Sequence, residues 1–100
     1  MTLQTKIKYQ FSAHLWRDAG SGWYFVTVPD NFSKEIRSNL QWQEEGWGRM
    51  KAVAIANDLK WKTSIWFDSK GKSYVLPVKA EVRKKLSLTV EDVLAISLFV

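Results

Sequence analysis

The chain has 100 residues, a formal net charge of +5, six tryptophans, no cysteine and one histidine, His14. A chain of this length forms a single domain with its own core. Without cysteine it has no disulfide and no thiolate metal site, and one histidine is too few for a zinc cluster. We therefore expect no cofactor.

No stretch of the sequence is typical of a membrane span or a secretory signal. The longest predominantly apolar run, residues 93–100, is far shorter than the ~20 residues that cross a bilayer. Residues 1–6 lack the apolar core of a signal peptide. We expect a cytoplasmic protein that makes no membrane contact.

The first two elements are predicted strands. Apolar and polar residues alternate from Ile7 to Leu15, a period of two that indicates one buried face and leaves His14 on the exposed face. A turn at residues 18–22 separates this run from an aromatic and β-branched run at 23–28. The two runs are predicted to form a hairpin that Pro29 closes.

A short helix and a third strand follow Pro29. Phe32, Ile36 and Leu40 lie four apart, on one helical face, and Asp30 or Asn31 can cap the helix. Residues 47–56 are predicted to form a strand whose segment 52–56 is apolar on both faces. That segment indicates a central place in the sheet.

The second half has the same order of elements. Residues 60–67 alternate as a strand after a turn at Asn57-Asp58, and a second turn at 68–71 leads into strand 72–76 and Pro77. These two strands are predicted to form a second hairpin. Residues 79–86 are predicted to be a helix, and residues 93–99 the last strand.

The sequence itself supports two related halves, at about residues 5–56 and 57–100. The run 24–29 with the later Glu35-Ile36-Arg37 recurs as 73–77 with Glu81-Val82-Arg83. Six strands and two short helices are too few for a wide sheet covered on both faces. We therefore predict a mainly β fold, a closed six-stranded barrel of two β-β-α-β halves, filled in large part by tryptophans.

Several runs carry a family resemblance that extends over essentially the whole chain. They are Phe11, Ala13 and Leu15, residues 22–29, Trp61-Lys62-Thr63-Ser64-Ile65, residues 74–80, Val82-Arg83 and the strand at 93–99. In these runs the chain resembles the bacterial family catalogued as domain of unknown function 1905. The resemblance implies a small duplicated β-barrel and carries no assigned activity.

A more distant similarity involves Leu76-Pro77, residues 82–86 and Glu91-Asp92-Val93. These runs resemble the swapped-hairpin barrels of the AbrB/MazE class, which bind DNA as dimers. Two copies in one chain then imply a monomer. Glu91-Asp92 stands where that class typically has Gly-Asp, so the resemblance does not establish a tight glycine turn at this position.

Positive charge is concentrated between Lys60 and Lys85, a stretch that contains eight basic residues and only two acidic ones. Lysine and arginine neutralise phosphates, and an exposed tryptophan stacks on bases. The same surface can attract an acidic protein or simply be solvated. The candidate binding residues are Lys60, Lys62, Trp66, Lys79, Arg83, Lys84 and Lys85.

The sequence offers no clear catalytic motif. It has no glycine-rich phosphate loop, His14 has no nucleophile turn beside it, and the acid pairs Glu44/Glu45 and Glu91/Asp92 are typical of solvated loops. We expect a non-catalytic binding or accessory module, with a protein partner as the leading hypothesis. Nucleic-acid binding through residues 60–85 and a small ligand inside the barrel are the alternatives.

Arg37 and Arg83 occupy equivalent positions in the two halves, each between an acid and an apolar helix residue. This placement favours a structural salt bridge that anchors each helix to the barrel, rather than a contact with a ligand.

Overall fold

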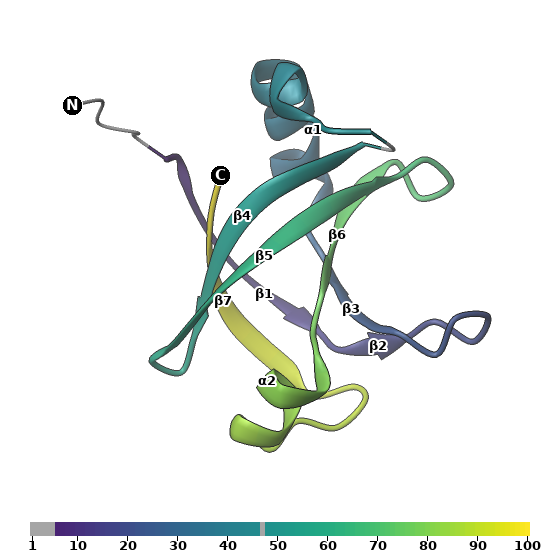
Figure 1. Cartoon of the computed structure of the whole chain (residues 1–100), viewed down its shortest axis with the longest axis vertical. Coiled ribbons are helices and arrows are strands. Elements are labelled where there is room, and N and C mark those ends of the chain that lie inside the picture. Colours follow the sequence, from purple (N-terminus) through teal and green to yellow (C-terminus); the bar gives the residue numbers. More distant parts are fainter. Residues whose placement is uncertain (1–5, 47) are drawn as a thin grey trace.

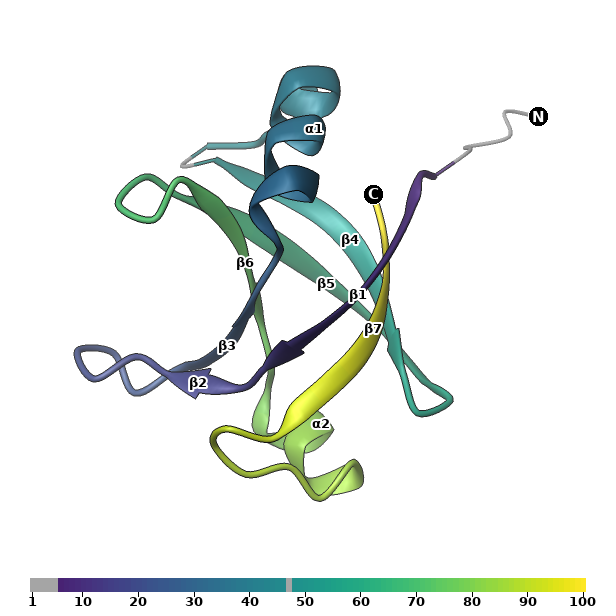
Figure 2. The same cartoon turned by 180° about the vertical axis from the view of Figure 1, so that it is seen from behind.

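The computed structural model describes residues 6–46 and 48–100 as a single curled antiparallel sheet with a short helix at each of two ends (Figures 1 and 2). The sheet has seven strands in the order β1-β7-β4-β5-β6-β3-β2. The strands are β1 (Lys8–His14), β2 (Trp16–Arg17), β3 (Tyr24–Thr27), β4 (Arg49–Ala56), β5 (Leu59–Asp68), β6 (Ser73–Pro77) and β7 (Val93–Phe99). The helices are α1 (Asp30–Leu40), continued by the 3-10 turn η1 (Gln41–Gln43), and α2 (Ala80–Lys85).

The mainly β class is confirmed, but the sheet is open, so the prediction of a closed six-stranded barrel is wrong. The chain changes partner at Leu15. β1 pairs with β7 along its whole length, whereas only the two residues of β2 pair with β3. The Leu15 N–H donates to Asp92 O, and the Leu15 carbonyl accepts from the Glu91 N–H, each at 2.8 Å. The run that starts at Ile7 therefore pairs with β7 through β1, and the residues after Leu15 pair with β3 through β2. These pairings replace the hairpin expected between residues 7–15 and 23–28.

Strands β5 and β6 separate from each other at Pro77. β5 and β6 pair only between Trp66–Asp68 and Ser73–Val75. Continuing this register would place Ser64 opposite Pro77, which has no N–H to donate to a strand ladder. β6 runs on along β3 and β5 along β4, so the two strands diverge (Figure 1).

The core lies on the inner face of the curled sheet. In β4, Met50 and the alanines that alternate after it are buried, whereas Arg49 and Lys51 are exposed. The predicted central place of this strand is confirmed, since it lies between β7 and β5. Burial on both faces is not observed, because Val53 and Ile55 are only half-buried.

Most tryptophans lie away from the core, contrary to the prediction that they fill the interior. Among the described residues, Trp61 is the one tryptophan that packs against the core cluster. Trp23 is 51% exposed and Trp42 is 79% exposed. Trp16 and Trp66 are half-buried, and Trp47 lies outside the described residues. Aliphatic side chains and Tyr74 fill the inner face instead.

Helix α1 is held by internal hydrogen bonds and has no side-chain cap, so the predicted capping role of Asp30 or Asn31 is wrong. Asp30 Oδ1 instead accepts a hydrogen bond from the Ser73 hydroxyl at 2.6 Å. The hydroxyl of Ser33, which is fully buried, donates to Val28 O at 3.1 Å and accepts from the Tyr74 N–H at 3.0 Å. Ser33 therefore joins α1 to Val28, directly after β3, and to β6.

The turn before β7 forms without glycine, because Glu91 adopts a φ of 77°. We expect Glu91→Gly to raise the free energy of unfolding by about 0.5–1 kcal/mol, since a non-glycine residue pays roughly 1–2 kcal/mol for left-handed backbone and glycine costs some unfolded-state entropy. Urea unfolding measures the change. The control Glu81→Gly, within α2, should destabilise the protein, and equal loss in both variants would contradict strain at Glu91.

Candidate functional site

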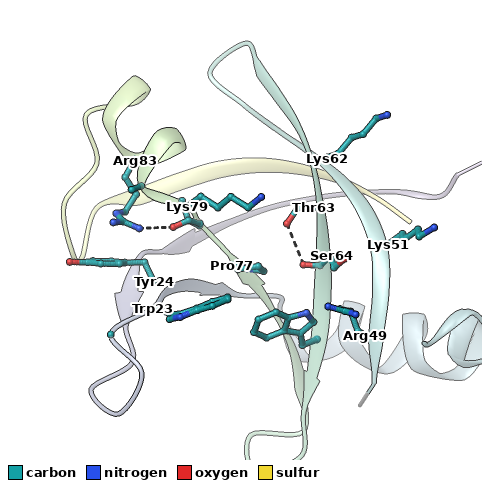
Figure 3. A pocket seen from close by; sticks show the side chains of 14 residues that line it. Trp23, Tyr24, Arg49, Lys51, Lys62, Thr63, Ser64, Pro77, Lys79 and Arg83 are labelled. Carbon is teal, nitrogen blue, oxygen red and sulfur yellow. Dashed lines mark hydrogen bonds between the residues drawn. The ribbon is translucent and has the colours of Figure 1, made fainter. Parts of the chain in front are cut away.

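A groove of about 660 Å³ lies where β5 and β6 diverge (Figure 3). One side is built by β4 and β5. The other side is built by the start of β3, the end of β6 and α2. The groove opens on the outer surface of the sheet, because all the β4 and β5 residues that line it except Thr63 alternate with the buried core residues Met50 and Ile65.

Five cationic side chains line the groove, and none of its described lining residues is acidic. Arg49, Lys51 and Lys62 lie on the sheet side, and Lys79 and Arg83 lie on the α2 side (Figure 3). Lys51 Nζ is 4.0 Å from Glu45 Oε2, but this pair is exposed and water screens it. The groove is therefore a concentrated positive region of the surface.

Cross-strand register brings the sheet-side residues together. Arg49 lies opposite Trp66, and Lys51 lies opposite Ser64. Lys60 and Lys62 lie opposite Ile55 and Val53 in the same register. Residues directly opposite each other in an antiparallel pair share a face. The predicted common face of Lys60, Lys62 and Trp66 is confirmed, and β4 adds two cations to it.

An aromatic cluster borders these cations. The ring centroids of Trp23 and Trp66 are 5.3 Å apart, and those of Trp66 and Phe25 are 5.9 Å apart. Trp16 packs on Phe25 at 5.1 Å and donates its Nε1–H to Thr27 Oγ1 at 2.9 Å. Trp23 is the half-exposed member of the cluster, so its indole is the surface on which a planar ligand can stack.

Arg37 makes the structural salt bridge predicted for it. Its Nη1 is 3.4 Å from Glu44 Oε2, and its guanidinium lies 3.8 Å from the centre of the Phe67 ring. Glu44 also accepts a hydrogen bond from the Tyr74 hydroxyl. Burial, and then this bond, hold the pKa of Tyr74 above its usual value. These contacts tie the end of α1 to β5 and β6.

Arg83 does not make the predicted salt bridge, and the anchoring prediction is wrong in this respect. Its guanidinium stacks 3.7 Å from the centre of the Tyr24 ring (Figure 3), and Nη1 donates to Val78 O at 2.7 Å. Within residues 6–46 and 48–100, no carboxylate oxygen lies within 4.0 Å of it. Arg83 is therefore held in place, and no carboxylate of the described chain offsets its positive charge.

Four of the seven candidate residues meet in the groove: Lys62, Trp66, Lys79 and Arg83. Lys60 shares their strand face without lining the groove. Lys84 and Lys85 are exposed elsewhere on α2, and Lys85 Nζ is 3.5 Å from Glu81 Oε1.

Sequence reasoning missed Trp23, Tyr24, Arg49 and Lys51 as lining residues. The alternation of Arg49, Met50, Lys51 and Ala52 was an available signal for a strand with one wet face. Nothing in the sequence indicated that this face would join Lys62 and Trp66.

Outside the groove, the structure also bears on catalysis, metal binding and membrane insertion. His14 lies on the exposed face of β1. Across residues 6–46 and 48–100, no group of three or more histidine, aspartate or glutamate side chains could hold a metal ion. In the same part of the chain, no helix is long and apolar enough to cross a bilayer.

Comparison with known proteins places the chain in a family without an assigned activity. A search of curated proteins finds no match. A model of a domain of unknown function, DUF1905, matches residues 11–98, a range that holds every residue lining the groove. The chain therefore belongs to the DUF1905 family.

Proposed function

We propose that the protein is a non-catalytic binding module that takes single-stranded nucleic acid in the groove between β5 and α2. The observation that carries this proposal is the makeup of the groove: five cations beside two tryptophans, with no acid among its described lining residues. Cations neutralise backbone phosphates, and an exposed indole stacks on a base of any identity.

The shape of the groove favours a single strand over a duplex. Sequence readers of duplex DNA insert a protruding helix or β-ribbon into the major groove. Here the cations line a hollow, with three on the sheet side and two on the α2 side (Figure 3). A single strand can lie in such a hollow with its bases turned towards Trp23.

A protein partner, the leading hypothesis from the sequence, is less well supported by this site. The centres of protein interfaces are depleted in charged residues, whereas this groove is rich in them. The other large apolar side chains that are exposed, Ile7, Trp42, Val90 and Val93, do not line it. A small ligand inside the barrel is disfavoured by the packed inner face.

The test is fluorescence anisotropy of labelled oligo-dT and oligo-U at about 50 and 200 mM salt. We expect micromolar binding that weakens by about 20- to 100-fold over this range, the effect of neutralising roughly three to five phosphates. Duplex DNA should bind more weakly than either single strand. No binding at the lower salt concentration would contradict the proposal and return an acidic protein partner to first place.

Two double variants separate the groove from general charge. Lys51→Gln/Lys62→Gln removes two groove cations, and Lys84→Gln/Lys85→Gln removes two cations of α2 outside it. We expect a loss of affinity of about tenfold or more in the first and under about threefold in the second. Equal losses would mean that overall charge, and not the groove, attracts the nucleic acid.

We further infer that the chain works as a monomer made of two related halves, at about residues 5–56 and 57–100. Strand pairing supports the relation between the two halves. If β1, β3 and β4 of the first half correspond to β5, β6 and β7 of the second, exchanging the halves turns the β1–β7 pair into the β5–β4 pair. The same exchange leaves the β3–β6 and β4–β7 pairs unchanged. Light scattering in solution tests the monomer.

A further inference from the structure

We propose that Arg83 is the phosphate-binding residue of the groove, taking a phosphate group through guanidinium N–H donors that have no acceptor in the described chain. The inference rests on the proposed function and deepens it, because it assigns the contact with the nucleic-acid phosphate to one residue. The shared chemistry is a phosphate group, whether in a nucleic-acid backbone or free in solution.

The guanidinium of Arg83 is already oriented. Stacking on Tyr24 at 3.7 Å sets its plane, and the 2.7 Å hydrogen bond from Nη1 to Val78 O sets its rotation within that plane. A guanidinium has five N–H donors in a rigid fork, and only this hydrogen bond is made by Arg83 within residues 6–46 and 48–100. A ligand would therefore meet a group that loses little side-chain freedom on binding.

The charge of Arg83 is also uncompensated. The residue is half-buried, and it shares the groove with Arg49, Lys51, Lys62 and Lys79. No carboxylate of the described chain pairs with it. Like charges gathered in one hollow raise the local concentration of anions. A phosphate bound to the fork would supply the missing counter-charge through charge-assisted, bidentate hydrogen bonds.

Arg37 provides an internal comparison. It is placed like Arg83 in its helix and also stacks on an aromatic ring, that of Phe67. Its counter-charge comes from within the chain, since Glu44 lies 3.4 Å away. When Arg37 is aligned with Arg83, Glu44 corresponds to Val90. A stacked arginine thus occurs at both helices, but the carboxylate is present at only one of them.

Arginine side-chain NMR tests the assignment directly on the unmodified protein. We expect the Nε–Hε signal of Arg83 to shift saturably on titration with inorganic phosphate and with oligo-dT, while that of Arg37 stays in place. A shift with phosphate alone would support the phosphate site and contradict the nucleic-acid proposal. Absence of a shift with both probes would overturn the assignment.

A charge-conserving substitution adds a second readout. Arg83→Lys keeps the positive charge but loses the fork, so affinity for oligo-dT should fall about tenfold, whereas Arg37→Lys should leave it unchanged. The melting temperature of each variant shows that it is folded. Wild-type affinity in a folded Arg83→Lys variant would overturn the role of Arg83 while leaving nucleic-acid binding by the groove intact.

Discussion

Replacing Trp23 with alanine should weaken the binding of single-stranded nucleic acid by about 5- to 150-fold. This is the range that corresponds to the roughly 1–3 kcal/mol contributed when a base stacks on an aromatic side chain. Trp23 is 51% exposed and packs against Trp66 at the edge of the five cations, so it is the aromatic surface that a base can reach. Because half of its surface is already in water, the fold should tolerate its loss.

Trp42→Ala is the matched control for this experiment. Trp42 is more exposed than Trp23, at 79%, but it lies in η1 and does not line the groove. Its removal should leave the affinity unchanged. Anisotropy at about 50 mM salt measures both variants, and a Trp23→Phe variant should retain intermediate affinity because it keeps a smaller aromatic face. If Trp42→Ala weakened binding as much as Trp23→Ala, stacking in the groove would be excluded.

The second large effect concerns stability. Ser33→Ala should lower the free energy of unfolding by about 2–6 kcal/mol, since it leaves two buried backbone groups without a partner and each costs roughly 1–3 kcal/mol. The groups are Val28 O, which accepts from the Ser33 hydroxyl, and the Tyr74 N–H, which donates to it. Both bonds are buried, so water cannot readily replace the lost hydroxyl.

Ser38 offers a control in the same helix, because it is exposed whereas Ser33 is fully buried. Ser38→Ala should change the free energy of unfolding by no more than about 0.5 kcal/mol. Urea unfolding of the wild type and both variants provides the comparison. A cost for Ser33→Ala as small as that for Ser38→Ala would show that the hydrogen bonds of Ser33 to Val28 and Tyr74 do not stabilise the fold.

Local patterns predicted the individual elements well. The turn between β4 and β5 was placed at Asn57-Asp58, and these residues have φ values of 48° and 67°, as a tight two-residue turn requires. The end of β6 was placed before Pro77, one residue short of its observed end. The second helix was predicted at 79–86 and spans Ala80–Lys85. In each case the signal is local, a turn residue, a proline or the spacing of apolar residues, so no distant contact is needed to read it.

Strand partners were harder to predict, because alternation shows which face of a strand is buried and not which strand lies beside it. The run from Ile7 to Leu15 has the right pattern for a hairpin with residues 23–28, yet β1 pairs with β7, about 85 residues later in the chain. The left-handed turn at Glu91 was likewise not predicted, because glutamate rarely adopts this backbone conformation; the turn is hydrogen-bonded to the backbone of Leu15.

The sequence alone determined that this protein is a small, mainly β domain of its family, with positive charge gathered in residues 60–85 and an arginine in each helix. Only the tertiary structure decided that β4 brings Arg49 and Lys51 to the strand face of Trp66. Only the tertiary structure also decided that Glu44 pairs with Arg37, whereas Arg83 stacks on Tyr24 without a carboxylate partner in the described chain. Composition and local periodicity depend on neighbours along the chain. The groove depends on the divergence of β5 and β6 at Pro77 and on long-range strand register, and no local pattern encodes the register.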